Sequence, residues 1–139
     1  MPATDDDTLI ALALGQRARA YAPYSRFTVG AALLCEDGDV VLGCNVENAS
    51  YGLCICAERT AVSAAVSQGK TRFTRIAVAT GSSPPAAPCG MCRQVLAEFA
   101  GDDEMVIILC NDRGEQTTTT LKEIFPGTFN QAQLKSGQK

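Results

Sequence analysis

Residues 75–110 read RIAVATGSSPPAAPCGMCRQVLAEFAGDDEMVIILC, and this stretch decides the fold. The apolar runs 75–79 and 105–110 are typical of buried strands. Between them, the proline-rich and serine-containing segment 81–88 predicts a loop that leads into a helix over 90–100. A strand, a helix and a second strand in succession indicate an α/β fold.

The rest of the chain supplies further helices and strands on both sides of this unit. They are a helix over 8–21 with aspartates at its positive end, strands 27–35 and 40–47 joined at Asp37-Gly38, a helix over 56–68 closed by Gly69, an edge strand over 115–120 and a helical turn over 121–125. Their order predicts a three-layer α/β/α sandwich with a mixed sheet of about five strands. The polar tail 130–139 is expected to be loosely ordered.

The chain is long enough for one domain with a sizeable core. Its 139 residues are 46% hydrophobic and 19% charged, and this length is too short for two ordinary domains. We therefore expect a single domain over 1–139. With 12 basic residues, 15 acidic residues and no histidine, the net charge is -3. A chain that lacks a positive field is not expected to bind a long nucleic acid.

Two features bear on the compartment. Apolar stretches fall short of the ~20 residues that span a membrane, and residues 1–7 are acidic where a signal peptide is basic and then apolar. We expect a cytoplasmic protein without membrane contact. Seven cysteines would suggest disulfides in a secreted domain, but the number is odd. Reduced thiols engaged in metal or redox chemistry fit better.

Two cysteine clusters stand where helices are expected to begin: CICAER at 54–59 and PCGMCR at 88–93. Free backbone N–H groups and the positive dipole end at a helix start lower the pKa of a thiol and favour the thiolate that a metal needs. Cys89 and Cys92 are three residues apart, so they lie on one side of the first turn and can hold one ion. Cys56 would approach the same ion from the other helix.

The thiols alone leave alternatives open. A Cys-x-x-Cys pair in a cytosolic protein is as often a redox pair as a metal site. Cys54 could also join Cys56, Cys89 and Cys92 in a closed structural zinc site with no room for water. Outside such a closed site, Cys54 is interpreted together with Cys35, Cys44 and Cys110, which lie on apolar strands or in a loop, as a small buried hydrophobic residue.

Glu58 favours a catalytic site. A carboxylate two residues after Cys56, on the first turn of a helix, is placed beside the ion without being needed as a ligand, and it can handle protons there. Three protein ligands and one open position are the arrangement of catalytic zinc. A ligand, one residue and a glutamate, followed later by Pro-Cys-x-x-Cys, form the signature of zinc nucleobase deaminases, which allow three cysteine ligands.

The sequence also resembles the small homotetrameric cytidine deaminases over roughly residues 8–130. The resemblance is carried by APYSRF at 22–27, GCNVEN at 43–48, CAERTA at 56–61, PCGMCRQ at 88–94 and PGTF at 126–129. It implies a zinc-dependent hydrolase with one Zn²⁺ per subunit. The implied reaction is deamination of cytidine, and of deoxycytidine, in pyrimidine salvage. It also implies a homotetramer that shares its active sites.

The resemblance further implies roles for single residues. Cys56, Cys89 and Cys92 would hold zinc, Glu58 would shuttle protons, Asn45 and Glu47 would hold ribose hydroxyls, Phe27, Val46 and Ala57 would contribute to the substrate pocket, Tyr51 and Phe129 would reach a neighbouring subunit's site, and Arg59 would donate to the ligand sulfurs. Cys54 has no ligand role in this pattern. Arg93 is either a second donor to the sulfurs or a solvated helix residue.

Strand geometry supports the sugar assignment independently. Asn45 and Glu47 are two apart on a predicted strand, so both side chains face the same side, and a carboxylate forms charge-assisted bonds with hydroxyls. Val46 points away and offers only backbone, while the facing of Phe27 stays open. The competing hypotheses are a deaminase of another aminated nucleoside or base and a non-enzymatic zinc module closed by Cys54. A polynucleotide-editing deaminase is disfavoured by the negative charge.

Overall fold

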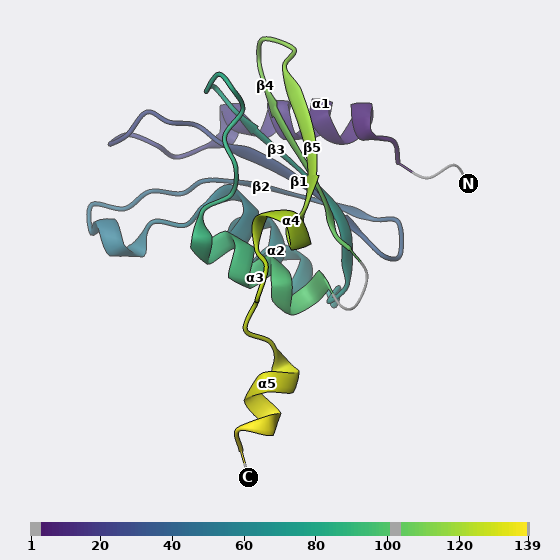
Figure 1. The fold of residues 1–139 in the computed structure, drawn as a ribbon. Helices are drawn as coiled ribbons and strands as arrows, with labels where there is room; N and C mark the ends of the chain where they lie inside the picture. The colour runs from purple at the N-terminus through teal and green to yellow at the C-terminus, as the bar shows by residue number, and fades with distance from the viewer. Residues whose placement is uncertain (1–3, 101–103, 139) are drawn as a thin grey trace.

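The computed structural model describes residues 4–100 and 104–138 and contains a mixed five-stranded sheet covered by helices on both faces (Figure 1). The strand order is β2-β1-β3-β4-β5. Only β3 and β4 pair in parallel in the described sheet, and the other neighbours are antiparallel. The strands are β1 Gly30–Cys35, β2 Val40–Cys44, β3 Phe73–Thr80, β4 Val106–Asn111 and β5 Gln116–Thr120. The predicted sandwich and its mixed sheet are confirmed.

The helices divide between the two faces of the sheet. Figure 1 shows α1 on one face and α2 and α3 on the other. The helices are α1 Asp6–Gln16, α2 Ala57–Ser67, α3 Gly90–Ala100, α4 Leu121–Ile124 and α5 Gln131–Ser136, with 3-10 turns η1 Arg17–Arg19 and η2 Tyr51–Leu53. Among the described residues, no helix combines the length and apolar character needed to span a membrane.

Alternation along the central strands explains this division. In β3, Ile76 and Val78 pack in the core beneath α2 and α3, whereas Ala77 and Ala79 pack in the core beneath α1. Because neighbouring side chains on a strand point to opposite faces, an unbroken apolar strand requires cover on both sides. The near-continuous apolar runs seen in the sequence are therefore the signature of the three layers.

Helix α1 is shorter than the sequence predicts. It begins as expected, where the Asp5 side chain accepts a hydrogen bond from Thr8 N at 2.8 Å. It ends at Gln16, ahead of the predicted end at 21, and continues as the turn η1. The reason is a long-range pairing, because Tyr21 N donates to Asn45 O at 3.0 Å and commits this backbone to an extended path.

The hairpin β1–β2 is also shorter than predicted. The ladder runs only from Gly30 opposite Cys44 to the turn. Outside it, the Asn45 amide replaces ladder bonds: its Oδ1 accepts from Val29 N and its Nδ2 donates to Phe27 O, both at 2.8 Å. The second strand thus ends as regular structure before Asn45 because a side chain takes over the pairing.

Helix α2 lies close against β2. A β-carbon at Gly43 would lie 2.5 Å from both Ala57 O and Ala61 N, so this position has room only for hydrogen. The helix ends where Gly69, at φ +84°, adopts the left-handed conformation expected from the sequence.

The C-terminal segment departs from the sequence prediction. The tail 130–139, which was expected to be loosely ordered, contains the helix α5. Asn130 caps this helix: its side chain accepts from Gln133 N at 3.0 Å, and the Gln133 side chain accepts from Asn130 N at 3.1 Å. Figure 1 shows α5 extending away from the sandwich.

Candidate active site

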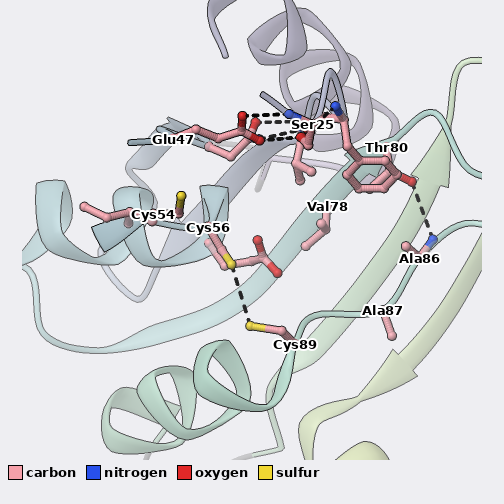
Figure 2. A pocket seen from close by; sticks show the side chains of 14 residues that line it. Ser25, Glu47, Cys54, Cys56, Val78, Thr80, Ala86, Ala87 and Cys89 are labelled. Carbon is pink, nitrogen blue, oxygen red and sulfur yellow. Dashed lines mark hydrogen bonds between the residues drawn. The ribbon is translucent and has the colours of Figure 1, made fainter. Parts of the chain in front are cut away.

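Three thiols from two helix starts come together on one side of the sheet. Cys56 is the N-cap residue of α2, Cys89 immediately precedes α3, and Cys92 lies in the first turn of α3. The sulfur of Cys89 is 3.6 Å from that of Cys56 and 3.4 Å from that of Cys92. Figure 2 shows the Cys56 and Cys89 sulfurs facing each other from separate segments.

This spacing fits a tetrahedral metal. Zn–S bonds of about 2.3 Å place two sulfurs on one tetrahedral zinc about 3.8 Å apart, and the observed separations of 3.4 and 3.6 Å are close to that value. In the described residues, these three cysteines are the group of potential ligands that could hold an ion. Three thiolates leave the fourth tetrahedral position open.

Arg59 provides positive charge next to the thiols. Its Nη2 donates to Cys56 Sγ at 3.5 Å and to Cys54 O at 3.4 Å. Hydrogen bonding with Cys92, reinforced by Arg59 and Cys89, lowers the pKa of Cys56 to about 5. The arginine therefore favours the thiolate form that a metal requires.

Arg93 and Cys54, whose roles the sequence left open, lie in different surroundings. Arg93 donates to two backbone carbonyls, from Nε to Pro88 O at 2.8 Å and from Nη1 to Ile124 O at 2.6 Å. It fixes the backbone ahead of Cys89 rather than contacting a sulfur. The Cys54 thiol accepts from Asn48 N at 3.4 Å and is not part of the three-thiol group.

Glu58 lies beside the thiols in the first turn of α2. Glu58 is only 4% exposed. Burial, with a smaller contribution from the charge of Cys56, raises the pKa of Glu58 to about 7. A carboxyl group with this pKa takes up and releases protons readily near neutral pH.

A cavity of about 340 Å³ opens in front of Glu58 and two of the thiols, those of Cys56 and Cys89. Its size is in the range of small-molecule sites. The walls are mainly apolar, and Figure 2 shows Glu47 with Ser25 at the end of the cavity opposite Cys56 and Cys89. The lining residues include Phe27, Val29, Asn45, Ile55, Val78, Thr80, Ala86 and Ala87.

Asn45 and Glu47 both line this cavity, as their spacing predicts. Asn45 is 9% exposed and is held by the backbone of residues 27 and 29. Glu47 Oε1 accepts from Tyr24 N at 3.0 Å and from Ser25 N at 3.1 Å, and Oε2 accepts from the Ser25 hydroxyl. These hydrogen bonds hold the pKa of Glu47 below its usual value, and the bond from the Ser25 side chain makes the largest contribution.

Comparison with known proteins shows the family. Residues 3–109 match the model described as the cytidine and deoxycytidylate deaminase zinc-binding region. The chain belongs to this deaminase family. A cytidine deaminase from Sporosarcina psychrophila is 46% identical over 94% of this chain and 95% of the relative, and one from Halalkalibacterium halodurans is 50% identical over 90% and 94%.

Solved structures agree with this assignment. The crystal structure of cytidine deaminase from Burkholderia pseudomallei has a TM-score of 0.86 and 47% identity, covering 91% of this chain and all of that one. The structure of the Mycobacterium tuberculosis cytidine deaminase has a TM-score of 0.76 and 42% identity, over 91% of this chain and 98% of that one. Zinc is therefore the metal that this deaminase's three thiols fit.

Of the remaining pocket residues predicted for the deaminase, some line the cavity and others do not. Phe27 lines the cavity. Val46 bridges Tyr21 and Ile55 through its backbone, and Ala57, the first residue of α2, is fully buried, and neither is among the lining residues. Tyr51 and Phe129, 74% and 56% exposed, also lie outside this chain's cavity.

Sequence reasoning assigned no role to several residues that shape the cavity. Ser25 lies within the motif at 22–27, and its contact with Glu47 could not be read from the sequence because it depends on how a loop folds back. Thr80 is 2% exposed at the end of β3, and its Oγ1 accepts from Ala86 N at 3.5 Å. A polar residue ending an apolar strand next to a loop was the available signal.

Proposed function

We propose that this protein hydrolytically deaminates cytidine and deoxycytidine to uridine and deoxyuridine with release of ammonia, as part of pyrimidine salvage. One observation carries the proposal: a single cavity is lined both by Glu58 with two of the thiols and by the hydroxyl-binding candidates Asn45 and Glu47. A base can reach Glu58 while its sugar is held by Asn45 and Glu47. The relatives named above are called cytidine deaminases.

The metal end supports the hydrolysis. When bound by Cys56, Cys89 and Cys92, zinc would supply Lewis acidity that makes water a nucleophile near neutral pH. In this proposal Glu58 takes a proton from the attacking water and delivers it to N3 of the ring as a C4–O bond forms. It then takes the proton of the new C4 hydroxyl and passes it to the amino group, so that the C4–N bond breaks, the C4 oxygen becomes a carbonyl and ammonia leaves. Its buried position beside Cys56 supports this role.

The other end supports recognition of a free nucleoside. The Glu47 carboxylate and the Asn45 amide can both bond to sugar hydroxyls. The base would then lie along the apolar wall, which includes Phe27 and Val78. Val46 and Ala57 would contribute through their backbone, since their side chains lie outside the cavity lining.

We include a homotetramer with shared sites in the proposal. Large apolar side chains are exposed around the segment that carries Tyr51, whose ring lies 5.9 Å from that of Tyr24. Contiguous exposed apolar residues are typical of interaction surfaces. The others near this segment are Tyr21, Phe27, Leu53 and Ile55. Phe129, on the segment that leads away from the sandwich, would reach the neighbouring site.

A cytoplasmic location completes the proposal. All the cysteines lack disulfide partners in the described structure, as expected in a reducing compartment. Three thiols kept available for zinc are consistent with such a compartment.

The function is tested by following the ultraviolet absorbance of cytidine with the purified, zinc-loaded protein. We expect conversion to uridine, loss of turnover in the presence of a zinc chelator and recovery when zinc is added back. Absence of turnover by zinc-loaded, folded protein would refute the proposal.

Shared sites are tested by mixing two inactive variants, Glu58→Gln and Phe129→Ala. If Phe129 serves a neighbour's site, mixed oligomers contain sites with an intact Glu58 and an intact Phe129 from different chains, and activity returns. Mixing without recovery, although the chains co-assemble, would show that each site is complete within one chain.

A further inference from the structure

The Glu47 carboxylate at the sugar end of the cavity is largely committed to the protein itself. Oε1 accepts two backbone hydrogen bonds, from Tyr24 N and Ser25 N at 3.0 and 3.1 Å, and Oε2 accepts one from the Ser25 hydroxyl. An ionised carboxylate offers about four acceptor positions in total. One position remains, and it is on Oε2.

The direction of the Ser25 hydroxyl is itself fixed. Its oxygen accepts a hydrogen bond from Phe27 N at 3.0 Å, so its proton is free to point at Glu47. The loop between them is held by a turn in which Arg26 N donates to Ala22 O at 3.0 Å. Arg26 has φ +59°, a conformation that a residue with a side chain adopts only when its surroundings impose it.

Ser25 and Glu47 stand between two adjoining hollows. Both line the cavity of about 340 Å³ that contains Glu58, and both line a second hollow of about 290 Å³ with Tyr24, Tyr51 and Cys54. Figure 2 shows the two side chains in contact at the end of the cavity away from Cys89. A carboxylate at such a boundary could turn toward either hollow unless something holds it.

We propose that Ser25 is a positioning residue that fixes the Glu47 carboxylate so that its last acceptor position takes a single sugar hydroxyl. Two backbone bonds to Oε1 hold one end of the carboxylate, and the Ser25 hydroxyl stops the other oxygen from rotating away. Ser25 also ties this orientation to the backbone that carries Phe27. This inference rests on the proposed function, because it concerns recognition of a nucleoside's sugar.

The test compares cytidine with 2′,3′-dideoxycytidine, which lacks the 2′- and 3′-hydroxyls that could donate a hydrogen bond to Glu47. In Ser25→Ala we expect KM for cytidine to rise about fivefold, a modest hydrogen-bond effect at an exposed position, with kcat changed by less than about twofold. For 2′,3′-dideoxycytidine we expect kcat/KM to be the same in Ser25→Ala and in the unchanged protein. Ser25→Thr keeps a hydroxyl and should restore the KM for cytidine.

A matched serine change away from the cavity provides the control. Ser67, at the end of α2, donates only to Ala64 O at 2.8 Å, and Ser67→Ala should leave both kinetic constants unchanged. If Ser25→Ala does not fold, as judged by thermal melting, Ser25→Cys gives the same comparison because a thiol is a weak donor.

Each outcome is decisive. A loss of kcat/KM in Ser25→Ala that is equal for the two nucleosides would mean that Ser25 merely supports the loop, and the inference would fail. A fall in kcat with unchanged KM would also overturn it. Absence of cytidine turnover by the unchanged protein would instead refute the proposed function.

Discussion

Gly43 of β2 lies directly beneath Ala57 of α2, at a distance that leaves no space for a side chain. A β-carbon at Gly43 would lie 2.5 Å from the Ala57 carbonyl oxygen. We predict that Gly43→Ala destabilises the protein by about 3 kcal/mol, because the atoms in the way are backbone and the whole helix must move. The measurement is the free energy of unfolding in denaturant, together with bound zinc, since α2 positions Cys56 and Glu58.

Gly15 is the matched control for this change. It lies within α1, and nothing is within 4 Å of the β-carbon that alanine would add. Gly15→Ala should stabilise the protein by about 0.5–1 kcal/mol, because glycine is unfavourable inside a helix. If Gly43→Ala were as well tolerated as Gly15→Ala, the close packing of α2 on β2 would be wrong.

Glu58→Gln tests the proton-handling carboxylate. The amide fits the same buried place but cannot take up or release protons, so kcat should fall by about 10²–10⁴ while zinc stays bound. The measurements are steady-state kinetics and metal content. Glu36→Gln, an exposed change in the hairpin loop, should have no effect. Loss of zinc from Glu58→Gln would assign the residue a structural role.

Cysteine substitutions separate an open zinc site from a closed one. Cys92→Ala should abolish zinc binding, because Cys92 is one of the three thiols that lie together. Cys54→Ala should retain one zinc per chain, because its thiol contacts the Asn48 backbone instead. Zinc content measured after dialysis checks both. Equal loss of metal in the two variants would support a four-thiolate site and the non-enzymatic module.

Arg93 should matter for stability through the carbonyls that it holds. Removing its guanidinium in Arg93→Ala leaves Pro88 O and Ile124 O without their donors. We expect a loss of about 2 kcal/mol in the free energy of unfolding. Arg93→Lys can serve one carbonyl and should recover part of the loss. An unchanged unfolding curve for Arg93→Ala would mean that these hydrogen bonds stabilise the protein no more than the bonds that the two carbonyls can form with water.

Cys110 is predicted to be an unreactive thiol. Burial raises its pKa to about 11, and it is 1% exposed. Only the thiolate reacts with iodoacetamide, and the thiolate fraction rises with pH, so Cys110 should stay unlabelled in folded protein at pH 8. In the zinc-loaded protein, peptide mapping by mass spectrometry would show labelling of the partly exposed Cys54 before Cys110. Labelling of both at equal rates would contradict this burial.

The sequence predicted best where local pattern and tertiary structure agree. The apolar runs that became β3 and β4 and the helix α3 were located within a few residues, because strands covered on both faces leave an unmistakable apolar signal. The zinc thiols brought together by the fold are those expected, because their spacing relative to helix starts decides where they lie.

The sequence failed where contacts between distant segments override local pattern. The helical spacing that includes Tyr21 continues past the true end of α1, whereas Tyr21 itself pairs with the distant Val46. By contrast, the start of α5 had a readable signal in Asn130 and Gln133, spaced as a capping box. The contact of Ser25 with Glu47 had none, since the loop that creates it follows no periodicity.

The two helix starts that meet at the thiols are separated along the chain by the whole of α2, the whole of β3 and the loop after it. An ion held by Cys56, Cys89 and Cys92 would therefore act as a cross-link that closes this long stretch into a ring. Metal supply would then govern how much of the protein is folded as well as how much is active. Under zinc starvation, the cell would lose the empty chains to degradation instead of storing them for later loading.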